Sequence, residues 1–202
     1  MKTKQLMLVL ALFGASAYVP QAQSKDRFSI GPRGGVNFST ITNVDNVESI
    51  TGLVLGLTST YSLNEHTGIT LDALYSSEGY KLPGEEAHLR YLQIPVYFDF
   101  FLGELGDRFR PKAYVGVAPA FFLGGKINDD DVIKKFWNKF LVSATGGVGF
   151  NYRLVNRVWL NTDLRAYIGL SDVRHKDYVV GDALNPRTVQ VSVGLAYGLS
   201  KL

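Results

Sequence analysis

The stretch Arg187–Ser200, RTVQVSVGLAYGLS, alternates in side-chain character without a break. From position 189 the odd-numbered residues are valine, leucine or tyrosine, whereas the even-numbered ones are small or polar. A period of two predicts a β-strand, because successive side chains point to opposite faces of a sheet. The apolar face would pack on a second sheet in a soluble sandwich. In an outer-membrane barrel it would face lipid, and the polar face would line a narrow lumen.

Strand length favours the barrel over the sandwich. A tilted transmembrane strand needs about 9–11 residues, whereas strands of globular proteins average about 5–6. A soluble lipocalin-like carrier also has long strands and stays an alternative. Clusters of Gly, Pro, Asn and Asp divide the chain after residue 25 into eight predicted strands, at 27–39, 50–63, 67–80, 88–102, 111–124, 139–154, 157–171 and 187–200.

The connections between these strands alternate in length. Short ones are predicted at 64–66, 103–110 and 155–156, and longer ones at 40–49, 81–87, 125–138 and 172–186. Outer-membrane barrels have short periplasmic turns and longer exterior loops, and an even number of strands. The sequence therefore predicts an all-β fold, an eight-stranded antiparallel up-and-down transmembrane β-barrel.

The predicted fourth strand contains a proline, Pro95. Proline has no backbone N–H and cannot donate a ladder hydrogen bond. We therefore expect a bulge or irregular pairing at this position. Aromatic residues gather toward the ends of the predicted strands, which is typical of the two aromatic girdles of a membrane barrel.

Charged residues also fall on the polar face of the predicted strands. Isolated buried charges are costly and persist when paired, and eight strands enclose an interior about wide enough for side chains. We therefore predict a structural network that fills the lumen; an ion or solute path is the alternative. The predicted members are Arg33, Asp72, Asp163 and Arg165 at mid-height, and Asp99, Lys112 and Arg153 nearer the periplasmic rim.

The N-terminus has the pattern of a secretory signal peptide. Lys2 and Lys4 precede a short apolar run, and Ala15-Ser16-Ala17 is a cleavage motif, with Ala22 as a second candidate. We predict a signal peptide at 1–22, cleaved after Ala17 or Ala22, and a barrel domain at 23–202. The chain has no cysteine, which excludes disulfides and a lipidated N-terminal Cys.

Charge does not indicate a nucleic-acid partner. Without the signal peptide the chain carries 19 basic and 18 acidic residues, so the basic pI comes largely from the part that is removed. Basic residues form no run interleaved with aromatics, the usual pattern of nucleic-acid binding.

Four segments together resemble a known family. In order they are Ile30–Ser39 (IGPRGGVNFS), Tyr91–Val96 (YLQIPV), Lys112–Pro119 (KAYVGVAP) and Gly146–Phe150 (GGVGF). Their order and spacing are similar to those of the PorT-like outer-membrane β-barrel proteins of Bacteroidetes. The resemblance covers the chain after the signal peptide and implies the barrel fold and location in the outer membrane of a Gram-negative cell. It implies little about activity, because folds host many functions.

The last predicted strand has a second resemblance. Ser192, Gly194, Tyr197 and Leu199 resemble the terminal-strand signal that the barrel-assembly machinery reads, in the order polar, glycine, aromatic, apolar. This implies the assembly machinery as a partner during biogenesis.

Other groups of residues give only weak indications of catalysis or metal binding. Ser171, Asp172 and His175 would lie at one rim and would have to form the catalytic set of a lipid-directed enzyme. The histidines His66, His88 and His175 lack the i, i+4 spacing of a helical zinc site. We expect no metal, no cofactor and no catalytic residue.

The predicted loop 125–138 has two features of its own. Asn128–Asp131 (NDDD) has oxygen ligands suited to Ca²⁺ but equally suits a solvated turn. Ile133, Phe136 and Trp137, with lysines beside them, predict a short amphipathic segment at the lipid headgroups.

These observations predict a monomeric, non-enzymatic outer-membrane barrel that acts as a scaffold or binds partners through its exterior loops. Its expected surroundings are outer-membrane lipid and lipopolysaccharide. The alternatives are a narrow channel for small solutes, a barrel enzyme acting on lipids, and the soluble carrier.

Overall fold

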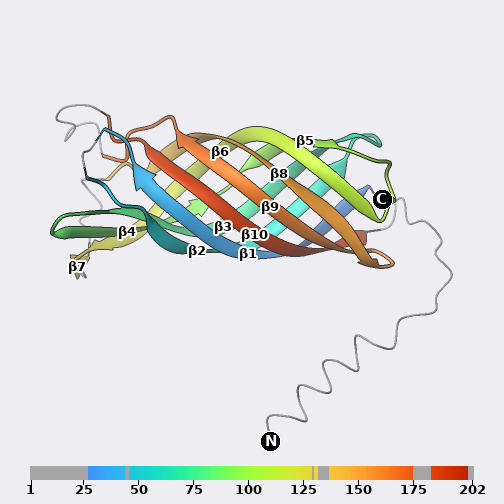
Figure 1. Ribbon diagram of the computed structural model, residues 1–202, viewed down its shortest axis with the longest axis horizontal. Helices are drawn as coiled ribbons and strands as arrows, with labels where there is room; N and C mark the ends of the chain where they lie inside the picture. Colours follow the sequence, from blue (N-terminus) through green and yellow to red (C-terminus); the bar gives the residue numbers. More distant parts are fainter. Residues whose placement is uncertain (1–26, 44–45, 129, 132–136, 175–182, 200–202) are drawn as a thin grey trace, which may run out of the picture.

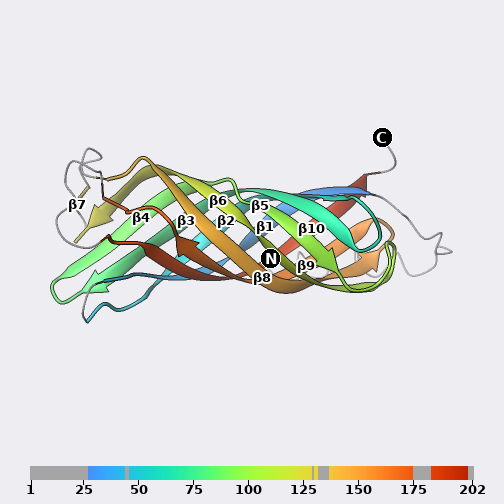
Figure 2. The same ribbon diagram turned by 90° about the horizontal axis from the view of Figure 1, so that it is seen from above.

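The computed structural model describes residues 27–43, 46–128, 130–131, 137–174 and 183–199. The predicted signal peptide and both cleavage sites lie outside these residues and stay predictions. The described residues form one antiparallel sheet, whose strands wind obliquely around a long barrel (Figures 1 and 2). The strands are β1 (Phe28–Ile41), β2 (Ile50–Ser62), β3 (Thr67–Leu82), β4 (Glu85–Gln93), β5 (Val96–Phe101), β6 (Phe109–Ile127), β7 (Asp130–Asp131), β8 (Phe140–Val155), β9 (Val158–Gly169) and β10 (Pro186–Leu199).

The sheet closes on itself through its first and last strands. β1 pairs with β10 over nearly its full length, from Phe28 opposite Leu199 to Ile41 opposite Pro186. The other pairings follow the chain, and β6 pairs with β8. Closure leaves no long unpaired edge, so the backbone hydrogen bonds are satisfied within the ring.

β4 and β5 pair with the same two neighbours, β3 and β6, and the break between them is at Ile94 and Pro95. The irregular pairing predicted at Pro95 is confirmed. The neighbours still use the backbone here, because the amide of Asp72 donates to the carbonyl of Pro95 at 3.0 Å and that of Ile94 donates to Pro119 at 2.9 Å. A bulge lies nearby, between Arg90 and Tyr91.

The two ends of the barrel differ. The connections 63–66, 102–108 and 156–157 lie at the end that holds Phe28 and Leu199, which we call the termini end. The opposite end, which we call the loop end, holds the strand ends Ile41, Ile50, Leu82, Glu85, Ile127, Phe140, Gly169 and Pro186. Figure 1 shows the termini end at the right and the loop end, with β4 and β7, at the left.

One predicted long connection is wrong. The segment 81–87 is a two-residue turn at Pro83 and Gly84, because β3 and β4 continue to Leu82 and Glu85. Gly84 has φ +85°, a left-handed conformation that favours glycine, and its surroundings are open. The connection 125–138 is also shorter than predicted, since β6 runs to Ile127 and pairs with the short strand β7.

The predicted alternation of faces in the last strand is confirmed for its described residues. Leu195 is 44% exposed on the outer face, and Ser192 on the inner face is 1% exposed. Large apolar side chains on the outer faces of the strands form an apolar belt around the barrel. The outside is therefore apolar and the middle of the inside is polar, the reverse of a soluble protein.

Toward the loop end the interior becomes apolar. Buried residues there form one cluster: Ile41, Tyr80, Ala87, Leu89, Tyr91, Ala120, Trp137, Leu141 and Val173. Trp137 is 8% exposed, and its ring stacks on Phe122 with centroids 6.0 Å apart. The prediction that Trp137 lies at the lipid headgroups is therefore wrong; it faces inward because the barrel offers an apolar interior here. Ile133 and Phe136 lie outside the described residues.

Candidate functional site in the barrel lumen

Four inward-facing charged residues meet across the middle of the barrel. Arg33 on β1 forms an ion pair with Asp163 on β9. Arg165, two residues further along β9, reaches Asp72 on β3 with 2.7 Å between Nη1 and Oδ2. Asp72 also lies 3.8 Å from Nε of Arg33. The strands place these residues together because each lies on the inward face at a similar height.

Lys112 on β6 joins the same group. Its Nζ lies 3.0 Å from Oδ1 of Asp163, so this carboxylate has both a lysine and an arginine beside it. All five side chains are buried. We call Arg33, Asp72, Lys112, Asp163 and Arg165 the lumen network. Removing a member would leave an unpaired buried charge, which is far more costly than an exposed one.

Tyrosine side chains surround Arg165. Its Nη1 donates to the hydroxyl of Tyr97 at 2.8 Å, and its Nε donates to that of Tyr114 at 3.0 Å. The hydroxyls of Tyr97 and Tyr167 are 3.0 Å apart, and Tyr167 donates to Gln190 at 3.1 Å. Tyr97 and Tyr167 were not among the predicted members of the network. Alternation gives the facing of a side chain and does not give its partner across the barrel.

From Gln190 the polar contacts continue toward the loop end. Gln190 donates to Asn37, and Asn37 donates to Ser76 at 2.7 Å. This series of hydrogen bonds ends at Glu78, a buried carboxylate. It accepts from Ser76 at 3.0 Å and from Gln93 at 2.6 Å. Glu78 was not predicted as a member of the network. It lies six residues after Asp72 on β3, so the alternation of the strand places both side chains on the inward face.

Two members of the predicted network are not joined by an ion pair among the described residues. Asp99 faces inward and accepts a hydrogen bond from Thr70 at 2.6 Å. Arg153 is buried, and its guanidinium lies 5.8 Å from the ring centre of Trp159. Both lie closer to the termini end than the lumen network does.

The four residues of the predicted assembly signal lie on both faces of β10. Ser192 and Gly194 face inward, and Ser192 accepts a hydrogen bond from Arg33 at 3.2 Å. Tyr197 and Leu199 face outward in the apolar belt. Recognition of these residues by an assembly machinery stays a prediction.

Among the described residues, Asp172 at the loop end is held by Arg174 and Leu184. Arg174 contacts its carboxylate at 2.8 Å, and the amide of Leu184 donates to it at 3.2 Å. Burial alone would raise the pKa of Asp172, but the hydrogen bonds from Arg174 and Leu184 outweigh it, so the pKa lies below the ordinary carboxyl range. Ser171 accepts from the amide of Val142. His175 lies outside the described residues.

In the described part of NDDD, Asn128 lies in a turn, and Asp130 and Asp131 form β7. The side-chain oxygen of Asn128 accepts from the amide of Glu86 at 2.8 Å, and its nitrogen donates to Gly84 at 2.9 Å. The side-chain oxygen of Asn128 therefore accepts a hydrogen bond within the protein. Asp129 lies outside the described residues, and across the described ranges no three His, Asp or Glu side chains converge as metal ligands would.

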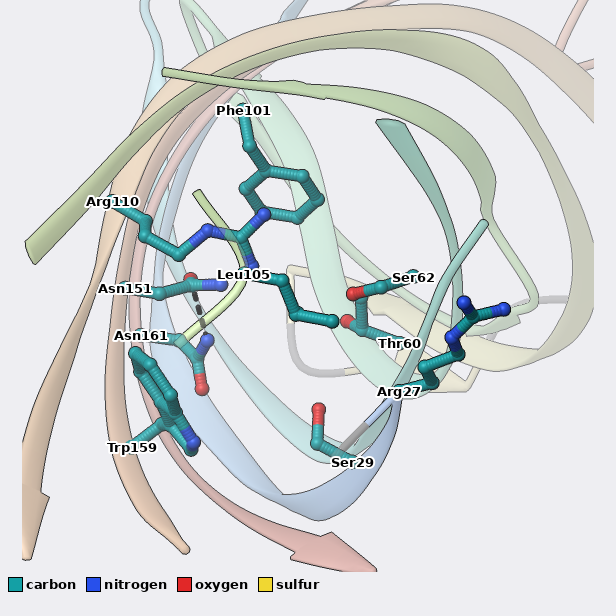
Figure 3. A pocket seen from close by; sticks show the side chains of 10 residues that line it. All are labelled: Arg27, Ser29, Thr60, Ser62, Phe101, Leu105, Arg110, Asn151, Trp159 and Asn161. Carbon is teal, nitrogen blue, oxygen red and sulfur yellow. Dashed lines mark hydrogen bonds between the residues drawn. The ribbon is translucent and has the colours of Figure 1, made fainter. Parts of the chain in front are cut away.

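A small cavity lies inside the termini end, and we call it the vestibule. Its volume is about 30 Å³. Figure 3 shows its walls, with Arg110 and Phe101 on one side and the hydroxyls of Thr60 and Ser62 on the other. The lining residues are Arg27, Ser29, Thr60, Ser62, Phe101, Leu105, Arg110, Asn151, Trp159 and Asn161. Sequence analysis missed Arg110, because it lay in a predicted turn.

A closed antiparallel ring that is apolar outside and polar inside has the build of a transmembrane β-barrel. Residues 21–174 match the family described as outer membrane protein beta-barrel domain, and the chain belongs to this family. It is an outer-membrane protein with an all-β antiparallel barrel fold.

Individual relatives agree with this assignment. The chain is 29% identical over 117 residues to outer membrane protein W of Escherichia coli, covering 52% of each protein. The chain thus spans about half the length of the curated relatives it matches. Outer membrane protein W of Shigella flexneri matches to the same extent.

Two solved structures share the fold. Neisserial surface protein A has a TM-score of 0.62 at 14% identity, over 85% of this chain and 97% of that one. OprG of Pseudomonas aeruginosa has a TM-score of 0.54 at 16% identity, over 90% of this chain and all of that one. In the described residues, no helix is both long and apolar enough to cross a membrane.

Proposed function

We propose that this protein is a non-enzymatic outer-membrane scaffold whose filled lumen holds the barrel rigid and whose loop end is displayed outside the cell. The observation that supports this most directly is the lumen network, in which Asp72 and Asp163 contact cationic side chains from three strands. Polar groups fill the middle of the lumen, and apolar side chains fill it toward the loop end.

We further propose eight membrane crossings. β4 and β5 share both neighbours and follow one another directly, so they count as two halves of one crossing. β7 pairs only with the end of β6, through two residues. With β4 and β5 combined and β7 set aside, the ring is even, and both described chain ends lie on the periplasmic side.

The same proposal includes the expected surroundings. The protein would be exported by its signal peptide, inserted by the barrel-assembly machinery, and function as a monomer among outer-membrane lipid and lipopolysaccharide. The resemblance to PorT-like proteins of Bacteroidetes belongs to this proposal too. The family match supports the outer-membrane location on which all of these statements depend.

Two measurements test the proposal. The protein should fractionate with the outer membrane, require detergent, and migrate differently on gels before and after boiling. In planar bilayers it should show little steady conductance, because paired charges and close packing leave no continuous water path. Large stable single-channel currents would replace the scaffold with the narrow channel, and recovery as a soluble species would replace the membrane barrel with the carrier.

A further inference from the structure

The vestibule is lined for an anion. Of its ten lining residues two carry a charge, and both are arginines, Arg27 and Arg110. Most of the other polar lining groups are serine, threonine or asparagine side chains or the indole of Trp159, and each can donate a hydrogen bond. Among the described residues, no carboxylate lines the cavity.

Arg110 is held in place but has a buried donor without a partner. It is 4% exposed, its Nη2 donates to the carbonyl of Glu65 at 2.6 Å, and its Cζ lies 4.1 Å from the ring centre of Phe101. Its Nε is buried and has no hydrogen-bond partner. A buried cationic donor without a partner is unfavourable, and an acceptor that entered the cavity would relieve this.

An unpartnered acceptor lies in the same cavity. Asn161 donates through Nδ2 to Asn151 at 2.6 Å, while its Oδ1 is buried without a partner (Figure 3). The vestibule therefore lacks both an anionic acceptor for Arg110 and an N–H donor for Asn161. A cavity of about 30 Å³ has room for about two water molecules or one carboxylate group, since one water needs ~10–15 Å³.

We propose that the vestibule binds the C-terminal carboxylate of an extended peptide. Nε of Arg110 donates to the carboxylate, and Oδ1 of Asn161 accepts the last peptide N–H. Peptides are recognised elsewhere by their terminal carboxylate, and arginine forms strong charge-assisted hydrogen bonds with carboxylates. Arg27 at the mouth adds electrostatic attraction. That the ligand comes from the periplasm rests on the orientation proposed above, whereas the binding itself does not.

Trp159 provides a direct readout, because it lines the vestibule. The other tryptophan, Trp137, lies in the apolar cluster at the loop end and is replaced by Phe to isolate the signal. The full chain in detergent micelles is titrated with N-acetyl-alanyl-alanine and with its C-terminal amide. We expect saturable binding of the acid and at least about tenfold weaker binding of the amide, because the amide cannot form the charge-assisted bond.

Substitutions locate the binding site. Arg110→Gln should weaken binding of the acid by about tenfold or more. Arg108→Gln is the matched control: Arg108 is exposed, two residues away, and stacked on Tyr152 with 5.2 Å to the ring centre. It should bind as the parent does. Asn161→Asp nearly preserves shape but adds a negative charge, so it should also abolish binding. Heat-dependent gel mobility checks that each variant is folded.

Three outcomes would overturn the proposal: no saturable signal with the acid, equal affinity for acid and amide, or equal weakening by Arg108→Gln and Arg110→Gln. The last would mean unspecific attraction to positive charge. If Arg110→Gln does not fold, the proposal is tested by Asn161→Asp and by the comparison of the acid with its amide. The L,L and D,D forms of the probe distinguish the source, since protein C-termini are L-peptides and cell-wall stem peptides end in D-residues.

Discussion

Asp163 is the carboxylate of the lumen network with the most cationic neighbours. It pairs with Arg33 and Lys112, and Arg165 lies 3.7 Å away. The sequence predicted all of these residues on the inward face, but it did not predict which of them pairs with Asp163. The face to which a side chain points follows from its position in the two-residue alternation of a strand. Pairing across the barrel depends on register and strand tilt, which a single sequence does not contain.

Replacing Asp163 should therefore destabilise the barrel strongly. Asp163→Ala removes the ion-pair partner of Lys112 and leaves Arg33 only its longer contact with Asp72. Breaking a buried pair typically costs about 3–5 kcal/mol. A second change, Arg33→Ala, should recover part of the loss, because it removes one of those cations. The free energy of unfolding in lipid vesicles measures both effects.

The exposed carboxylate Asp130 provides the control, since Asp130→Ala should have little effect. Strictly additive losses for Arg33→Ala and Asp163→Ala would show that the two side chains do not stabilise each other.

At the scale of elements, the sequence predicted the strands well and the loop end poorly. Long alternating runs with turn residues between them predicted eight strand positions close to those observed, and Pro95 predicted the break between β4 and β5. Where β3 and β4 extend past the apolar belt, the outer face becomes polar and the inner face apolar. The pattern there resembles that of a polar loop, so the turn at Pro83 and Gly84 was missed.

Neighbouring glycines on β1 offer a test of strand packing. A Cβ on Gly35 would lie 2.2 Å from the carbonyl oxygen of Val191 on β10, an approach that backbone cannot easily relieve. A Cβ on Gly34, which faces outward, would first meet the flexible end of Leu55 at 3.1 Å. Gly35→Ala should therefore destabilise the barrel by about 1–3 kcal/mol, as overpacking does, and Gly34→Ala by clearly less.

Denaturant titration in lipid vesicles compares these two variants under identical conditions. Equal stability would mean that β1 and β10 are not packed as closely as the structure shows.

At the scale of the whole molecule, the barrel divides its interior into three zones. The vestibule lies at the termini end, the lumen network in the middle, and the apolar cluster at the loop end. Composition and alternation predicted the middle zone because charges stand out on an otherwise small and polar face. They did not predict the other two, since an inward-facing Trp137 or Arg110 has the same local pattern as a residue in a surface loop.

Because Phe28 lies opposite Leu199, the first and last strands pair with each other like any other two neighbours in the ring. A circular permutant joins Leu199 to Phe28 by a short linker, opens the turn between Asn156 and Arg157, and carries the signal peptide before Arg157. It keeps every strand pairing and the same end of the barrel for both termini. Purified and refolded in lipid, it should reach nearly the stability of the parent. Failure to refold would contradict ring closure through β1 and β10.

The permutant also separates the place of β10 in the ring from its position in the order of synthesis. β8 becomes the last strand to leave the ribosome, and β10, with Ser192, Gly194, Tyr197 and Leu199, becomes internal while its neighbours stay the same. If those residues are read as a terminal signal, the permutant should reach the outer membrane of living cells poorly although it folds well in vitro. Undiminished insertion would show that the cell recognises the closed ring and not its last strand.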